Sequence, residues 1–130
     1  MSENNTTSPL EELYTDAGEL DLNRIVNTLK SFVSIQRVDH KVFFSQEGHA
    51  LKNDDKMLTY CLVKKLLASE GKVESEGVSG KEIHEATEIP KGTVDPAVQK
   101  LKKMGLLVGS GSNYQIPNRR VAEVLERLEK

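Results

Sequence analysis

Residues 88–108, EIPKGTVDPAVQKLKKMGLLV, limit the fold of this chain more than any other part of the sequence. Pro90 disfavours helix at the residue before it, and Gly92 supplies turn geometry, so one helix cannot run through this point. A helical apolar spacing then extends over 94–104, and Gly105 is typical of a residue that ends a helix. The segment therefore predicts two helices separated by a tight turn, with a short Leu-Leu-Val strand after the second.

The starts of these two helices can also be predicted from side chains. Ser79, with Glu82 three residues later, forms a capping box and predicts a short helix over 79–89. Thr93 can cap the following helix. Pro96 then falls at the third helical position, where a missing N–H group costs no hydrogen bond.

The N-terminal half of the chain predicts two longer helices with a hairpin between them. Apolar residues follow a helical spacing over 22–33, where Asp21 is placed to cap the helix. Alternating apolar residues over 33–44 predict a β-hairpin, and SQEGHALKN after it predicts a loop. The helix over 55–71, which Asn53 or Asp54 is placed to cap, is apolar around much of its circumference, so we expect it at the centre of the core.

The remaining signals lie at the ends of helices and near the C-terminus. Gly71 stands where a left-handed residue would end the second long helix. Residues 106–108 and 114–116 predict a second small hairpin around the loop GSGSN. Residues 118–130 have the apolar spacing of an amphipathic helix.

The turn segment and its neighbours follow the pattern hydrophobic-x-x-A-T, then I-P-x-G-T-V, then V-x-x-L-x-x-x-G-L-L. The residues that match are Ile83, Ala86, Thr87, Ile89, Pro90, Gly92, Thr93, Val94, Val98, Leu101, Met104, Gly105, Leu106 and Leu107. With VGSGSNYQI after them, they resemble the winged helix-turn-helix family, and in particular small archaeal winged-helix DNA-binding proteins. The resemblance implies a mainly α fold with small β-hairpins, in which a winged helix-turn-helix follows a helix-hairpin extension.

Charge and composition divide the chain further. Residues 1–21 carry six acidic side chains and no Lys or Arg, whereas the rest has 18 basic and 14 acidic residues. We therefore expect an acidic, disordered tail over 1–19 and a mildly basic body. The body divides into the extension (20–55), the winged helix-turn-helix (56–117) and the C-terminal amphipathic helix (118–130).

The resemblance implies a DNA-binding protein, a transcriptional regulator, with the third helix (93–104) in the major groove of double-stranded DNA. An α-helix fits that groove by its width. In this interpretation Thr93 and Gln99 read base edges, and basic residues contact phosphates. The basic residues are Lys91, Lys100, Lys102 and Lys103 on the helix, and Arg119 and Arg120 after the second hairpin.

Other features favour a different partner. The loop GSGSN has no basic residue, Asp95 lies on the outward face of the third helix, and the sequence pI is about 5.9. Winged helices also act as protein–protein modules, because a fold does not determine a function. The alternative is therefore an adaptor module that does not bind DNA directly.

No residue pattern indicates an enzyme, a cofactor, a metal site or a small-molecule ligand. His84 and Glu88 are spaced for a metal, but a third ligand is missing and a surface pair is the simpler interpretation. Cys61 lies on the apolar side of a helix and is expected to be a small core residue. One cysteine, a polar N-terminus and no long apolar run favour a cytoplasmic protein without a membrane span.

A homodimer is expected, because one winged helix contacts few base pairs and two half-sites improve specificity. The apolar stripes of helices 22–33 and 118–130 are the two candidate surfaces. We expect the interface on the C-terminal helix, centred on Leu125 and Leu128. In the other interpretation both stripes pack on the body of the same chain.

Overall fold

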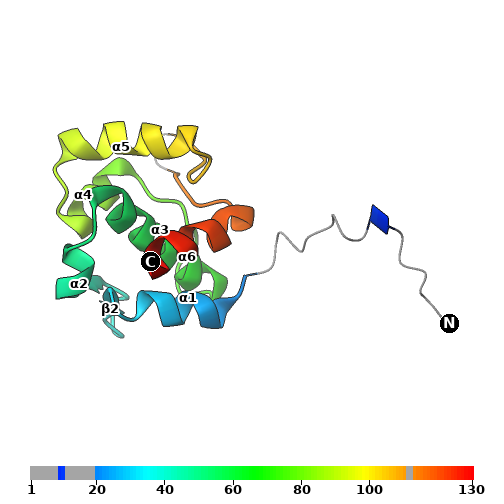
Figure 1. Ribbon diagram of the computed structural model, residues 1–130. Helices are drawn as coiled ribbons and strands as arrows, with labels where there is room; N and C mark the ends of the chain where they lie inside the picture. Colours follow the sequence, from blue (N-terminus) through cyan, green and yellow to red (C-terminus); the bar gives the residue numbers. More distant parts are fainter. Residues whose placement is uncertain (1–8, 11–19, 111–112) are drawn as a thin grey trace.

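The computed structural model describes residues 9–10, 20–110 and 113–130. Figure 1 shows a mainly helical body, with α5 along one side and α1 along the opposite side. Its sheet is a single antiparallel hairpin, β2–β3, within the described residues. This confirms a mainly α fold with a small β component. The prediction for the tail lies outside the described residues, apart from residues 9–10.

The N-terminal part of the body contains α1 (Leu22–Leu29), β2 (Val33–Ile35), β3 (Val42–Phe44) and α2 (Gln46–His49). The Asp21 side chain accepts a bond from Arg24 N at 3.0 Å, which confirms the predicted cap. The predicted hairpin is also confirmed, with Ser34 opposite Phe43. The helix ends four residues earlier than expected, because the chain must extend to enter β2. The predicted loop after β3 contains α2, which Ser45 caps through Gly48 N.

The central element is α3 (Asn53–Ser69), which packs against α1, α4, α5 and α6. It is buried on most sides, as the apolar circumference predicted. Its buried residues are Lys56, Met57, Leu58, Thr59, Tyr60, Cys61, Leu62, Val63, Lys65 and Leu67. Gly71 follows with a φ of 71°, so the predicted left-handed end is confirmed.

The next two helices are α4 (Gly80–Thr87) and α5 (Lys91–Lys103). Gly105 has a φ of 78°, which confirms the predicted stop after α5. The predicted cap at Thr93 is wrong, because α5 begins two residues earlier and Pro90 is the residue before it. The carbonyl of Pro90 accepts bonds from the N–H groups of Thr93 (2.8 Å) and Val94 (3.0 Å), which draws these residues into the first turn.

This earlier start also corrects the expectations for Gly92 and Pro96. Gly92 lies inside α5 and is not among the residues with a positive φ. Pro96 is the sixth residue of α5, so it removes the bond that an N–H there would donate to the carbonyl of Gly92. Both residues are exposed, and water can therefore bind that carbonyl.

The predicted second hairpin is reduced to isolated bridges among the described residues. Val108 pairs with Gln115, and Val78 pairs with Tyr114, both antiparallel. These bridges bring the segment before α4 and the segment after α5 side by side. The chain ends in a short 3-10 turn, η2 (Asn118–Arg120), and α6 (Val121–Glu129).

Helix α6 packs on α1 and α3. Leu125 is 1% exposed and Leu128 is 5% exposed within the single chain. Their side chains are thus part of the protein's own core and are not available to a second copy. The expectation that they form the centre of a dimer interface is wrong, and the interpretation in which this stripe packs on the body holds.

In the part of the chain that the structure describes, every helix is too short or too polar to cross a bilayer.

Candidate nucleic-acid interface

Local hydrogen bonds fix the turn between α4 and α5. Glu88 adopts the left-handed conformation, with a φ of 66°, and its N–H donates to the His84 carbonyl at 2.9 Å. The ring of His84 donates from Nδ1 to the carbonyl of Ile89 at 2.6 Å, because a carbonyl oxygen can only accept. His84 therefore holds the turn, and this contact explains the residue without a metal.

The start of α4 is tied to α3. Ser79 accepts a bond from Glu82 N at 3.0 Å, as expected of a capping residue. The predicted return bond of the capping box, from Ser79 N to the Glu82 carboxylate, is wrong. This carboxylate turns to α3 instead, where it accepts a bond from the Tyr60 hydroxyl at 2.6 Å and pairs with Lys64 at 3.2 Å. Burial and this carboxylate raise the pKa of Tyr60, so its hydroxyl stays protonated and remains a donor.

The turn and the α3 contacts together set how α5 lies on the body. Its inward face carries Val94, Val98 and Leu101, each at most 1% exposed. The opposite face is a solvent-exposed line of four residues, Gly92, Pro96, Gln99 and Lys103. We call these four residues the outward line of α5. Open space surrounds Gly92, so the helix backbone is bare at that end.

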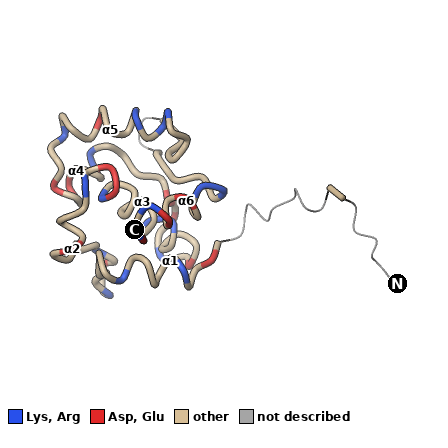
Figure 2. The backbone as a smooth tube through the Cα atoms, viewed as in Figure 1, with Lys and Arg blue, Asp and Glu red and all other residues tan. Residues whose placement is uncertain are grey.

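The predicted contact residues of α5 do not all have the same surroundings. Lys91 pairs with Asp95 at 3.1 Å, and Lys100 reaches across to Asp54 of α3 at 2.8 Å. Lys102 lies beside the outward line, with its ammonium 5.7 Å from the centre of the Tyr114 ring. Thr93, Gln99 and Lys103 are exposed. Figure 2 shows blue segments, which mark Lys and Arg, along this helix.

The two predicted arginines lie beyond the C-terminal end of α5. Arg120 pairs with Glu123 at 2.8 Å, and its guanidinium covers Gly105, where a Cβ would come within 3.2 Å of Nη2. Arg119 is exposed in η2. Arg120 thus holds the end of α5 in place, while Arg119 presents its charge to solvent.

Sequence reasoning missed a buried polar link that positions these segments. The Lys65 side chain is only 1% exposed, and its ammonium donates to Glu76 in the linker before α4 and to Asn118 at the start of η2. One residue of α3 thereby joins the segments on both sides of the α4–α5 unit. The available signal was the helical spacing, which places Lys65 on the apolar stripe of its helix.

The thiol of Cys61 is buried, which raises its pKa to about 12. In the unfolded chain the thiol ionises near pH 8.5. Between about pH 8.5 and 12 only the unfolded state therefore releases the proton, and this release stabilises the unfolded state. We expect this group to lower the free energy of unfolding by about 1.4 kcal/mol for each pH unit above roughly 8.5. Urea melts of wild type and Cys61→Ala from pH 8 to 10 check this, and parallel pH dependences of the two would contradict it.

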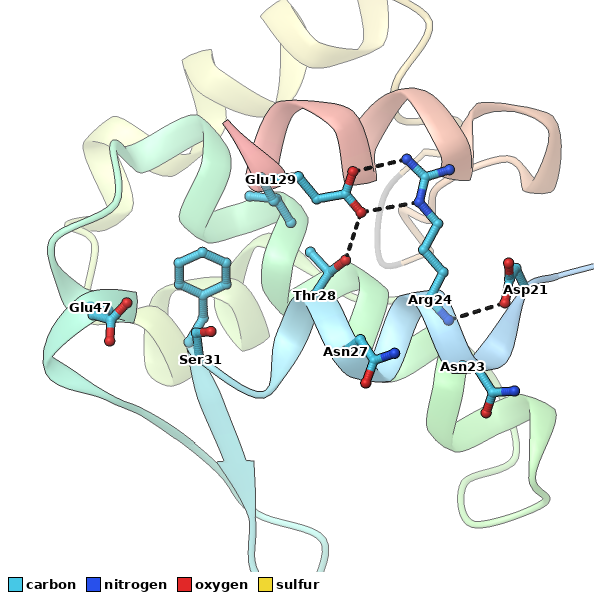
Figure 3. Close-up of a pocket in the computed structure, with 10 residues that line it drawn as sticks. Asp21, Asn23, Arg24, Asn27, Thr28, Ser31, Glu47 and Glu129 are labelled. Carbon is cyan, nitrogen blue, oxygen red and sulfur yellow. Dashed lines mark hydrogen bonds and ion pairs between the residues drawn. The ribbon is translucent and has the colours of Figure 1, made fainter.

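A hollow of about 640 Å³ lies elsewhere, between α1, α2 and α6 (Figure 3). There Arg24 donates two bonds to Glu129, at 2.9 and 3.0 Å, and Thr28 donates a third. These bonds lower the pKa of Glu129 and raise that of Arg24. Arg24 and Glu129 thus neutralise each other, and their bonds join α1 to α6 across this hollow.

No family model, no curated protein and no solved structure matches this chain. No cluster of three or more His, Cys, Asp or Glu side chains that could hold a metal occurs within residues 9–10, 20–110 and 113–130.

Proposed function

We propose that this protein is a winged helix-turn-helix DNA-binding protein, a transcriptional regulator, that inserts α5 into the major groove. The observation that carries the proposal is the outward line of α5. Gly92 has no side chain and Pro96 has a small one. The backbone in the first half of the outward line can therefore approach the floor of the major groove closely. Gln99 and Lys103 follow one and two turns later, where they reach a base edge and a phosphate.

The bridges around α4 and α5 support the same assignment. In a winged helix a strand before the helix pair adds to the hairpin after it, and here Val78 pairs with Tyr114 while Val108 pairs with Gln115. The wing would then be built from residues 106–110 and 113–116. Its contact with DNA would come from the backbone and from polar side chains, because GSGSN has no basic residue.

The charges on α5 imply weak DNA binding with only a modest dependence on salt. Asp95 neutralises Lys91, and Asp54 holds Lys100, so Lys103 and Lys102 carry most of the usable charge on this helix, with Arg119 nearby. Each phosphate that a protein neutralises steepens the dependence of the logarithm of affinity on the logarithm of salt by about 0.9. Few such contacts predict a shallow slope and detectable binding only at low salt.

Three single substitutions test the proposal by fluorescence anisotropy with duplex DNA at low salt. Lys103→Glu is expected to weaken binding about tenfold or more, because an attraction to phosphate becomes a repulsion. Asp95→Asn is expected to strengthen binding, because it removes a carboxylate beside the groove. Arg37→Glu, in the turn of the β2–β3 hairpin on the side away from α5 in Figure 1, makes the same charge change as the control. DNA binding that responds equally to Lys103→Glu and Arg37→Glu, or no binding by wild type, would sink the proposal.

An adaptor module is the second candidate, favoured by two exposed apolar residues beyond the end of α5. Met104 is 41% exposed and Val108 is 37% exposed. If this surface binds a protein, Met104→Glu abolishes capture of that protein in a pull-down, whereas Lys103→Glu leaves it unchanged. The opposite pattern favours DNA.

A further inference from the structure

The outer edge of β2 pairs with no other described strand, whereas α2 and α4 pack against β3. Gln36 N donates to Lys41 O, and Ser45 N donates to Phe32 O, both at 2.8 Å. In an antiparallel ladder, bonded pairs alternate, so Ser34 and Phe43 form the bonded pair between these two. The N–H and C=O groups of Val33 and Ile35 therefore point away from β3, along the open edge of β2.

An apolar groove runs beside this edge, between β2, α1 and α3. Its volume is about 170 Å³, and its lining residues are Val26, Leu29, Lys30, Val33, Ser34, Ile35, Val63 and Leu66. Val26 is 44% exposed and Leu22, one turn earlier on α1, is 36% exposed. The exposed stripe of α1 thus continues into the groove.

The side chains of β2 do not protect its edge from pairing. Exposed edges in native proteins commonly carry Lys, Pro, a bulge or an inward charge that prevents association. The strand Val33–Ile35 is uncharged, has no proline and pairs with β3 in unbroken register. An edge of this kind is suited to binding another extended strand.

We propose that the open edge of β2 and the exposed stripe of α1 form a homodimer interface, in which β2 pairs antiparallel with β2 of a second copy. A two-fold axis at Ser34 sets Val33 opposite Ile35 of the second copy. Because the N–H and C=O groups of both residues point outward, they can form the hydrogen-bonded pairs between the two copies. Ser34 then faces Ser34 of the second copy as a non-bonded pair. The strand is therefore self-complementary, and the two hairpins become one four-stranded sheet.

The area that a stable interface needs and the charge of the strand both fit a second copy of this chain as the binding partner. A stable interface covers about 800 Å² on each partner, roughly a tenth of the 7858 Å² surface of this chain. One strand edge is too small for this, so Leu22 and Val26 of α1 must take part. Charge does not oppose such a pair, since the strand Val33–Ile35 carries no charged side chain.

The dimer would leave α5 free. Figure 1 shows α1 and β2 on the side of the body opposite α5. The two α5 helices would therefore lie on the outer sides of the dimer, suited to two separate surfaces and not to adjacent half-sites on one face. This inference goes beyond DNA binding and does not depend on it.

Substitutions at Ser34 test the dimer by light scattering at high protein concentration. Wild type is expected at twice the chain mass of 14.5 kDa. Ser34→Lys and Ser34→Glu each place like charges directly opposite, so each is expected to weaken the dimer about tenfold or more. Mixing these two variants is expected to restore a heterodimer, because opposite charges then face each other. Ser34→Thr, a favourable cross-strand pair, is the matched control and should remain dimeric.

A cross-linking experiment gives an independent measurement. Non-bonded antiparallel pairs have Cα atoms about 4.5 Å apart, within the range of a disulfide. Ser34→Cys is expected to form a covalent dimer on mild oxidation, while Ser69→Cys, exposed at the end of α3, is not. Cys61 is buried and does not compete. A monomeric wild type, a dimer unaffected by both charged variants, or a monomer that binds an extended peptide of another protein along β2 would overturn the proposal.

Discussion

Replacing Glu76 with alanine is expected to lower the free energy of unfolding by about 3 kcal/mol. The change removes the carboxylate that pairs with the Lys65 ammonium while leaving that charge 1% exposed inside the protein. Asn118 still accepts one bond, but an amide does not neutralise a buried charge. We place the loss at the lower end of the range for buried pairs because the Glu76 side chain is 26% exposed and water can enter.

Urea denaturation of four variants separates the charge from the packing. Lys65→Met keeps the long apolar stem and removes the charge, so it should cost less than Glu76→Ala. Combining Lys65→Met with Glu76→Ala should recover stability relative to Glu76→Ala alone, because no unpaired charge remains. Glu76→Gln, which keeps an acceptor, should lie between wild type and Glu76→Ala. Additive losses in the double variant would show that the two residues do not act as a pair.

Local signals in the sequence predicted the elements of this fold well. Gly71 and Gly105 have the positive φ values that their positions after helices require, and Ser79 caps α4 through a backbone N–H. The alternation around β2 and β3 gave the observed hairpin. Each of these features depends on residues a few positions apart, which is why the sequence alone was sufficient.

Contacts between distant residues could not be predicted in the same way. A helical wheel identifies Lys100 as outward, but it cannot show that Asp54, 46 residues earlier, takes up its charge. It places Lys65 on an apolar stripe without its partner Asn118, 53 residues later. The candidate DNA surface is therefore narrower than predicted, since the residues available to a ligand depend on which charges the fold has already paired.

The error over α6 has a similar origin. A stripe of apolar residues is equally consistent with a core and with an interface, and the sequence does not give the position of α1 or α3 relative to it. In the structure α6 packs against both of them, and Arg24 of α1 binds Glu129 near its end. The open apolar surface is instead on α1, where Val26 is 44% exposed. The dimer hypothesis thus moves from α6 to α1 and β2.

Replacing both Leu125 and Leu128 with lysine is expected to unfold the chain. Each substitution buries an ammonium group without a partner, and Leu125 is only 1% exposed. An unpaired buried charge costs several kcal/mol, so two of them approach or exceed the 5–15 kcal/mol by which a domain of this size is stable. The helix signal in circular dichroism should be low, and no cooperative thermal transition should remain.

The same helix provides a matched control. Ala122 and Glu126 lie on the exposed side of α6, so replacing both with lysine introduces the same side chains without burial. This control should retain the wild-type circular dichroism spectrum and melt cooperatively within a few degrees of wild type, because surface substitutions change stability by about 0.5 kcal/mol or less. A folded, monomeric Leu125→Lys, Leu128→Lys variant would instead show that these leucines form an interface. A single Leu125→Ala change, which creates a cavity without a charge, should cost about 2–5 kcal/mol and leave a measurable folded state.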